Sequence, residues 1–146
     1  MSAPPVSRVI VLAETGSTNA DAMRLALAGE ALPLWVRADR QTGGRGRSGL
    51  VWTSQSGNFH ASVAFLSRAP LSAAGQLALV AAIAILDAIT DICGPGTTLA
   101  HPHLRLKWPN DVLIGTAKTG GILVETTQAR GEPGFLAVIG FGVNLA

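Results

Sequence analysis

The sequence predicts an α+β domain built on a mixed, largely antiparallel β-sheet with its helices packed on one face. Three observations predict this class: a strand–helix–strand start, one long apolar helix in the middle, and a run of strands after it. Of the 146 residues, 48% are hydrophobic, which is enough for one domain with its own buried core. The sequence has no internal repeat and no low-complexity linker, so we expect residues 1–146 to form one domain.

The first third of the chain predicts a strand, a helix and a second strand. Residues 8–13 (RVIVLA) are β-branched and apolar, as in a buried strand. A helical pattern follows, with Thr18 and Asp21 in the spacing of a capping box and Gly29 as its end. Residues 34–38 (LWVRA) form the second expected strand and lead directly into a glycine- and arginine-rich loop.

The middle of the chain holds a third strand and the longest predicted helix. Residues 58–66 alternate well enough for a strand. Residues 70–92 are apolar on nearly every side, which favours a helix sandwiched between other layers and ended by Gly-Pro-Gly at 94–96. The most apolar part, 77–86, is shorter than the roughly 20 residues that a membrane span needs.

The last third is expected to contain four strands joined by turns. A Pro-Asn-Asp turn at 109–111 separates the first two strands, and a hairpin turn at 115–118 follows the second. The sequence QARGEPG joins the last two of these four strands. The four strands are expected at 104–108, 112–114, 121–127 and 135–143.

Composition excludes several classes of protein. The net charge is only +2, whereas a general nucleic-acid binder carries a basic excess on one face. One cysteine, Cys93, excludes an internal disulfide framework. The N-terminal residues lack the basic and apolar regions of a signal peptide. We therefore expect a cytoplasmic protein that binds neither DNA nor a membrane.

The loop at 41–49 (QTGGRGRSG) contains the residues of a known nucleotide-binding motif, but the structural context that the motif requires is missing. It contains G-x-G-x-x-G, but a dinucleotide fold requires a helix after it, and LVWTS follows instead. A protein kinase needs a lysine on a nearby strand and an Asp-Phe-Gly, but the first lysine is Lys107 and that tripeptide is absent. A P-loop needs glycine before its lysine, and Ala117 precedes Lys118.

The chemistry of this loop nevertheless suits an anion. Its glycines allow backbone N–H groups to approach a bound anion closely. Arg45 and Arg47 would project from the same side of an extended segment, where guanidinium groups suit phosphate or carboxylate oxygens. A flexible basic surface turn and an RNA-binding arginine–glycine segment remain the alternatives at this point.

Four stretches of the sequence together resemble the biotin protein ligases of the biotin–lipoate ligase superfamily. They are STN at 17–19, QTGGRGRSGLVW, LKWPNDVLIGTAKTGGILVE and IGFGVN, and they occur in the order typical of that family. Both lysines of the chain fall in the third stretch, although nine of the eleven basic residues are arginines. The resemblance implies the fold of the biotin/lipoate ligase catalytic domain, which is similar to class II synthetases.

The resemblance implies a two-step reaction. The carboxylate of biotin attacks the α-phosphorus of ATP, which gives biotinyl-5′-AMP and pyrophosphate. A lysine of a biotin carboxyl carrier protein then attacks this mixed anhydride and releases AMP. ATP and biotin are thus the expected substrates, with Mg²⁺ accompanying ATP. The alternative is a non-catalytic biotin- or carrier-binding remnant.

The resemblance also assigns roles to individual residues. Arg45 and Lys118 are expected to neutralise the two anions that step one joins, and Asp111 to orient the carrier lysine or help to bind magnesium. No metal-ligand spacing links the histidines. The residues expected to bind biotin or ATP are Ser17, Thr18, Asn19, Gln41, Gly44, Arg45, Gly46, Arg47, Lys107, Asn110, Lys118, Gly121 and Asn144.

Structural roles are the alternative for several of these residues. Ser17 and Thr18 also suit a helix cap, and Asp111 and Gly121 suit a turn. Lys107 and Asn110 also suit shaping the turn at 109–111 or an indirect contact with phosphate. Trp52 is as consistent with packing as with stacking on adenine, and His60 is expected to be structural.

No helix-turn-helix is expected before the first strand, and the chain ends directly after GFGVN. The resemblance implies further elements beyond that point, including a C-terminal β-barrel domain. We therefore expect residues 1–146 to be a ligase catalytic domain that is incomplete at its C-terminal end. The carrier protein is the expected partner, and a homodimer is compatible with the resemblance.

Overall fold

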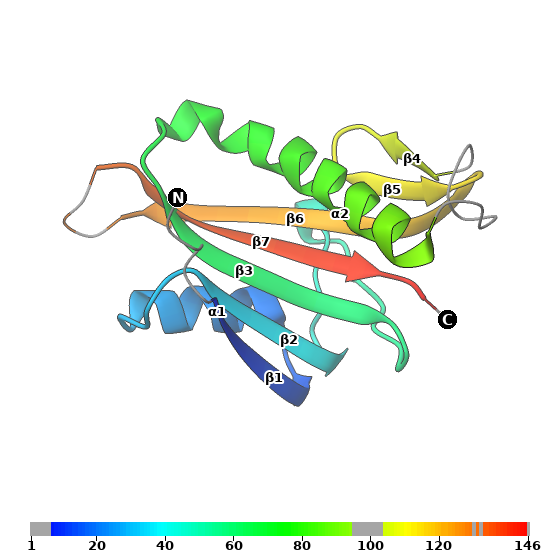
Figure 1. Ribbon diagram of the computed structural model, residues 1–146. Coiled ribbons are helices and arrows are strands. Elements are labelled where there is room, and N and C mark those ends of the chain that lie inside the picture. Colours follow the sequence, from blue (N-terminus) through cyan, green and yellow to red (C-terminus); the bar gives the residue numbers. More distant parts are fainter. Residues whose placement is uncertain (1–6, 95–103, 130, 132, 146) are drawn as a thin grey trace.

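The computed structural model describes residues 7–94, 104–129, 131 and 133–145 (Figure 1). Two short 3-10 helices, η1 and η2, accompany the regular elements. In chain order the elements are β1 (Arg8–Thr15), α1 (Thr18–Leu27), β2 (Leu34–Gln41), η1 (Arg47–Gly49), β3 (Phe59–Ser67), η2 (Leu71–Gln76), α2 (Leu77–Cys93), β4 (Leu104–Lys107), β5 (Asp111–Ile114), β6 (Ala117–Gln128) and β7 (Phe135–Val143).

The strands form one seven-stranded sheet with the order β1-β2-β3-β7-β6-β5-β4. β1 and β2 run parallel, joined by the crossover helix α1, and every other neighbouring pair is antiparallel. The predicted α+β class with a mixed, largely antiparallel sheet is confirmed. Figure 1 shows how β6 and β7, the last long strands of the chain, occupy the middle of the sheet beside β3.

Two strand boundaries differ from the predicted ones and affect the candidate site. β2 continues to Gln41, so the beginning of the glycine- and arginine-rich loop is still part of the sheet. β6 begins at Ala117, because Gly115 takes a positive φ of 61° and closes a tight hairpin turn after β5. Lys118 therefore lies on a strand rather than in the turn predicted at 115–118.

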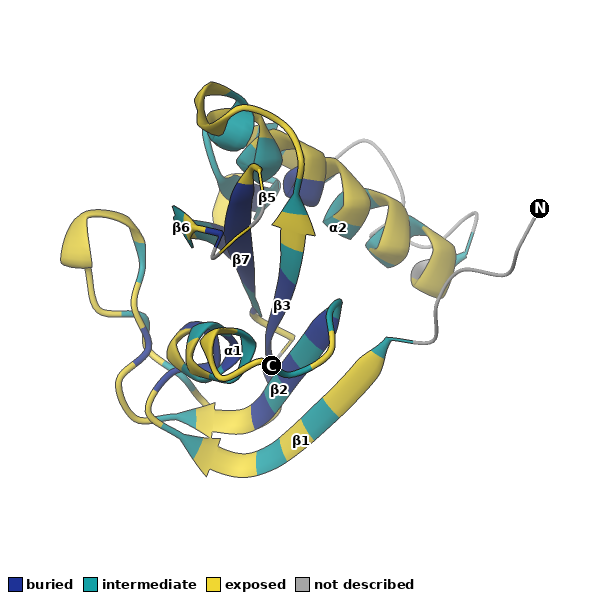
Figure 2. Ribbon diagram, turned by 90° about the vertical axis from the view of Figure 1, so that its left-hand side faces the viewer, coloured by how far each residue is buried: buried dark blue, intermediate teal, exposed yellow. Residues whose placement is uncertain are grey.

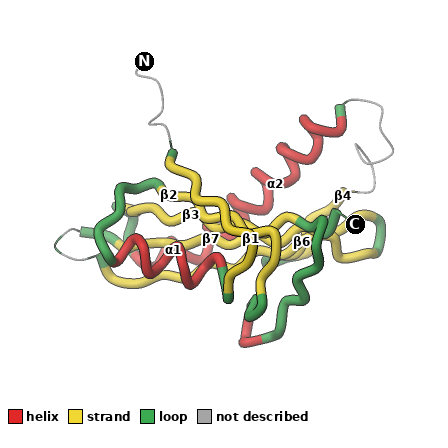
Figure 3. The backbone as a smooth tube through the Cα atoms, turned by 90° about the horizontal axis from the view of Figure 1, so that it is seen from below, coloured by secondary structure: helices red, strands yellow, loops and turns green. Residues whose placement is uncertain are grey.

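The two helices cover opposite faces of the sheet, which differs from the prediction of one face. On one face, Ala22 of α1 packs against Ala64 and Val138. On the other face, Ala82 of α2 packs in a cluster that contains Ile139. The central strands alternate their apolar side chains between both faces, so each face needs a cover. Figure 3 shows α1 and α2 on opposite sides of the strands. We call these the α1 face and the α2 face.

α2 packs on the sheet with one side and leaves its other side exposed (Figure 2). Ala81 and Ala82 are buried, whereas Val80 is 61% exposed and Ile83 46%. The prediction of a helix sandwiched between layers is thus wrong for the described residues. The helical stretch Leu71–Ile92, which η2 and α2 form together, is longer than the apolar run seen in the sequence, and by length and composition alone it could cross a membrane.

Candidate active site

A cavity of about 300 Å³ opens on the α1 face of the sheet. The start of α1, the end of β2, the loop between β2 and β3, and the hairpin of β5 and β6 surround it. Its walls are formed by Ser17, Thr18, Asn19, Gln41, Arg45, Gly46, Arg47, Leu50, Val51, Trp52, Asn110, Asp111, Lys118, Gly121, Ile122, Leu123, Gly140, Phe141 and Gly142. Most residues that the sequence predicted for the site therefore meet at one place.

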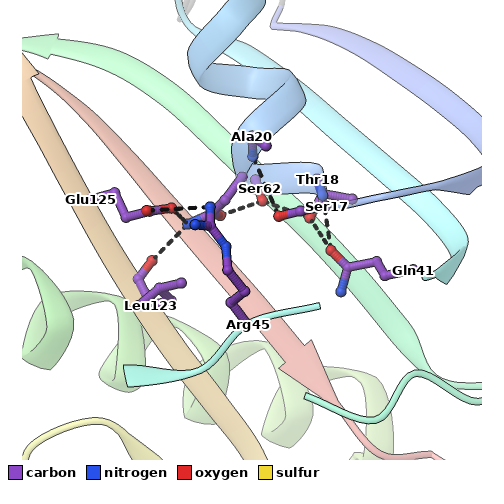
Figure 4. A network of polar contacts seen from close by, with 9 residues as sticks. Ser17, Thr18, Ala20, Gln41, Arg45, Ser62, Leu123 and Glu125 are labelled. Carbon is purple, nitrogen blue, oxygen red and sulfur yellow. Dashed lines mark hydrogen bonds and ion pairs between the residues drawn. The ribbon is translucent and has the colours of Figure 1, made fainter. Parts of the chain in front are cut away.

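One end of the cavity is lined by uncharged polar side chains that bond to one another (Figure 4). The backbone nitrogen and Oγ1 of Thr18 donate to Oε1 of Gln41 over 2.8 and 3.0 Å. Oγ of Ser62 lies 2.7 Å from Oγ1 of Thr18 and 2.6 Å from Oδ1 of Asn19. Ser17 is the N-cap of α1 and still lines the cavity, so capping and binding are compatible there.

Glu125 of β6 connects this polar end to the arginine loop. Nδ2 of Asn19 donates to Oε2 of Glu125 over 2.8 Å, and the guanidinium of Arg45 lies 3.5 Å from Oε1 (Figure 4). The carboxylate thus orients a neutral amide and a cation together. Sequence reasoning missed Glu125, although an acid that ends the apolar run Ile-Leu-Val of a strand was a usable signal.

The loop that carries Arg45 is held in place by backbone contacts. The backbone nitrogen of Trp52 donates to the Gly44 carbonyl over 2.9 Å, and that of Gly46 donates to the Leu50 carbonyl over 2.7 Å. A Cβ atom at Gly44 would lie 2.8 Å from the Trp52 carbonyl oxygen, so this close approach requires glycine. Gly44 therefore packs closely against the backbone of Trp52 within the loop and does not line the cavity.

The two loop arginines reach different partners, although both line the cavity. Arg45 faces Glu125, whereas Nη1 of Arg47 donates to Oδ1 of Asn110 over 3.4 Å. Asn110 also donates from Nδ2 to the Ile122 carbonyl over 2.8 Å, which fixes the turn before β5 against β6.

The cavity wall opposite the polar end is formed by Lys118, Asp111 and Trp52. Nζ of Lys118 lies 2.8 Å from Oδ1 of Asp111 and 5.5 Å from the centroid of the Trp52 ring. Asp111 is the first residue of β5 rather than a turn residue, and it is the register partner of Gly121. A Cβ atom at Gly121 would lie 2.9 Å from Cζ3 of Trp52, so the glycine leaves room for the indole ring.

Two further predicted binding residues lie outside the cavity walls. Lys107 is exposed on β4, near the edge of the sheet. Asn144 follows β7, where its backbone nitrogen donates to the Thr119 carbonyl over 2.7 Å and its Oδ1 accepts from Asn58 over 3.3 Å. Asn144 thereby ties the end of β7 to β6 and to the loop before β3.

A family model described as biotin/lipoate A/B protein ligase matches residues 14–144. The chain belongs to this family. It is 45% identical over 139 residues to a biotin–[acetyl-CoA-carboxylase] ligase of Paracoccus denitrificans, which covers 93% of this chain and 54% of the relative. It is 36% identical over 138 residues to the ligase of that name from Mycobacterium tuberculosis, covering 92% and 48%. The chain thus spans about half the length of the curated relatives it matches.

Solved structures of biotin protein ligases share the fold of this family member. The Leishmania major enzyme in complex with biotinyl-5-AMP gives a TM-score of 0.76 at 30% identity, with 99% of this chain and 59% of that chain covered. The Aquifex aeolicus enzyme in complex with biotin and ATP gives 0.70 at 31% identity, with 94% and 52% covered.

This member of the biotin/lipoate ligase family shows no metal centre within residues 7–94, 104–129, 131 and 133–145, because no three His, Cys, Asp or Glu side chains converge there. Asp111 and Glu125, the carboxylates beside the cavity, each face a cation.

Proposed function

We propose that this chain is the substrate-binding part of a biotin–[acetyl-CoA-carboxylase] ligase. Such an enzyme activates biotin with ATP to biotinyl-5′-AMP and transfers biotin to a lysine on the carrier domain of a biotin-dependent carboxylase. The observation that carries the proposal is the meeting of Arg45 and Lys118, from distant parts of the chain, with the polar set of Thr18 and Gln41 around one cavity. Relatives that bear this name and a fold neighbour solved with biotinyl-5-AMP support it.

The polar end of the cavity suits the ureido ring of biotin. That group presents N–H donors and a carbonyl acceptor, and the side chains of Ser17, Thr18, Asn19 and Gln41 offer both kinds of partner. Gly140 leaves room for one of these side chains, because a Cβ atom there would clash with Oδ1 of Asn19. Biotin would thus bind with its ring at the start of α1 and its carboxylate toward the loop.

The cationic residues suit the first chemical step. A carboxylate and a phosphate repel each other, so a positive field must favour the transition state. The Arg45 guanidinium can bridge two oxygens, while the Lys118 ammonium acts as a point charge on one oxygen. Both are held by carboxylates, Glu125 and Asp111, so they are ordered before substrates arrive.

The second step needs a neutral amine on the incoming carrier lysine. Asp111 is the carboxylate on the cavity wall, and we assign it the role of orienting that amine toward the adenylate. Mg²⁺ would enter with the phosphates of ATP, because it prefers phosphate oxygens and water to an all-protein cage. A biotin carboxyl carrier protein is the proposed partner, and the cytoplasm, where ATP is available, is the proposed location.

The alternative of a non-catalytic biotin-binding remnant is not favoured, because both proposed catalytic cations line the cavity. Biotin-dependent exchange of pyrophosphate into ATP tests the two functions in the full-length protein. Lys118→Ala should lower the exchange rate about 10²–10³-fold, since it removes a charge that stabilises the transition state. Arg8→Ala, which removes a cation from an exposed ion pair with Glu30, is the matched control and should retain exchange. Biotin binding without any exchange by the unsubstituted protein would support the remnant instead.

A further inference from the structure

His60 and Trp52 carry buried nitrogen atoms without a hydrogen-bond partner. Among the described residues these are Nε1 of Trp52 and both ring nitrogens of His60. The His60 side chain is fully buried, with 0% exposed surface, in the middle of β3. Leaving buried polar atoms unpaired is costly, so native proteins generally pair them. The positions of His60 on β3 and of Trp52 in the loop between β2 and β3 therefore require a structural explanation.

A row of residues across four strands brings these two side chains into the same region. Gly121 of β6 is the register partner of Gly142 of β7, and Gly142 is the register partner of His60 of β3. Asp111 of β5 stands at the other end, opposite Gly121. The two central glycines leave a trough on the α1 face between Asp111 and His60.

The indole of Trp52 fills this trough. A Cβ atom at Gly121 would lie nearest to Cζ3 and Cη2 of Trp52, at 2.9 and 3.3 Å. A Cβ atom at Gly142 would instead lie nearest to Cζ2, Cε2 and Nε1, at 2.5, 2.6 and 2.9 Å. The ring thus extends from β6 across β7 with its nitrogen edge away from β6, toward the strand that carries His60.

The two side chains are chemically complementary. An indole nitrogen can only donate, whereas a neutral imidazole offers one donor and one acceptor. Burial lowers the pKa of His60, so the imidazole stays neutral and one ring nitrogen can accept a hydrogen bond. An interaction with the Gln55 backbone raises the pKa, but its effect is smaller than that of burial.

We infer that His60 is a positioning residue, whose imidazole acceptor receives the indole N–H of Trp52 and fixes that ring in the trough. The consequence concerns the cavity wall, because Lys118 lies 5.5 Å from the centroid of the same ring. His60 thereby sets the surface beside Lys118 without touching the cavity itself. This consequence for ligand binding rests on the proposed function, whereas the contact between His60 and Trp52 does not.

NMR of the uniformly ¹⁵N-labelled chain tests the contact directly. A through-hydrogen-bond coupling between Nε1 of Trp52 and an imidazole nitrogen of His60 is expected, with Trp52→Phe assigning the indole signal. In His60→Leu the Trp52 indole proton should exchange with solvent at least about tenfold faster. His60→Gln, which keeps an acceptor, should restore slow exchange. The indole signals of Trp35 and Trp108 report whether each variant is folded. An absent coupling, or equal exchange in wild type and His60→Leu, overturns the inference.

Kinetics then test the consequence for the cavity. His60→Leu should raise the KM for ATP about 3- to 10-fold with a smaller change in kcat, and His60→Gln should recover most of the loss. In a Trp52→Phe background, which lacks the N–H, His60→Leu should add no further loss. Equal effects of His60→Leu in both backgrounds would contradict a role through Trp52. A protein without biotin-dependent turnover would refute the proposed function, yet the NMR result would still decide the contact.

Discussion

Nζ of Lys118 lies 2.8 Å from the Asp111 carboxylate and above the Trp52 ring. The pair joins β5 to β6 at the cavity wall, where the side chain of Lys118 is 47% exposed and that of Asp111 21%. The ammonium is therefore oriented by a charge on one side and an aromatic face on the other, while one side stays open to the cavity. This arrangement leads to the first prediction.

Asp111→Asn should lower the rate of pyrophosphate exchange about tenfold and lower transfer to the carrier more strongly. The amide no longer holds Lys118 by charge and no longer orients the attacking amine, and losing one such electrostatic contact typically has an effect of this order or larger. Single-turnover assays of adenylate formation and of transfer separate the two effects. Asp87→Asn, on the exposed side of α2, is the matched control. Equal rates for Asp111→Asn and wild type in both steps would remove Asp111 from the mechanism.

Glu125→Ala should weaken biotin binding about tenfold or more. It deletes the charged acceptor of the Asn19 amide, a type of hydrogen bond that contributes about 1.5–3 kcal/mol. Glu125→Gln keeps an acceptor for Asn19 and should bind biotin more tightly than Glu125→Ala. Isothermal titration with biotin measures both, with Glu14→Gln on β1 as the control at an exposed ion pair. Unchanged affinity in Glu125→Ala would show that Asn19 needs no support from β6.

Gly142→Ala should displace the Trp52 indole, because the new methyl group would lie 2.5 Å from Cζ2 of that ring. We expect a loss of about 1–3 kcal/mol in the free energy of unfolding, as in other overpacked sites. A change in Trp fluorescence and a higher KM for ATP should accompany it. Gly75→Ala, where an added Cβ atom meets nothing within 4 Å, is the matched control. Equal thermal stability and fluorescence in the two variants would contradict the trough.

His60 should make the stability of the protein depend on pH. Burial lowers the pKa of His60 below its ordinary value of 6.5, so below about pH 6.5 the unfolded chain binds a proton that the folded chain does not. The free energy of unfolding should therefore be largest above that pH and decrease as the pH falls below it. Urea titrations between pH 7.5 and about pH 5 measure this slope, which should be reduced in His60→Leu. The same slope in both proteins would mean that His60 is not buried in its neutral form.

Much of the fold could be predicted from local patterns. The alternating or apolar runs indicated the strands, and the glycines marked most of their ends. The opposite placement of α1 and α2 could not be predicted, because the strand pairing decides which face each helix meets. Val138 and Ile139 are both buried, on different faces, and only the sheet order reveals that each face needs a cover.

Site residues that stand out in a sequence motif could be predicted, whereas contacts that only the fold brings together could not. Arg45 and Lys118 stood out through their motifs. Glu125 and Trp52 lie in the same stretches, but their contacts with Asn19, Arg45 and Lys118 depend on the fold. The binding role of Lys107 stays a prediction. Lys107 shares a stretch with Lys118, and β4 places it opposite Asp111 in the register, outside the cavity walls.

The most direct test is detection of the adenylate itself. The full-length protein is incubated with biotin and α-³²P-labelled ATP, and labelled biotinyl-5′-AMP is separated and quantified. We predict adenylate formation with biotin, a rate reduced about 10²–10³-fold in Lys118→Ala, and a rate close to wild type in the control Arg8→Ala. An adenylate formed with lipoate but not with biotin, or one formed at equal rates by the two variants, would contradict the account.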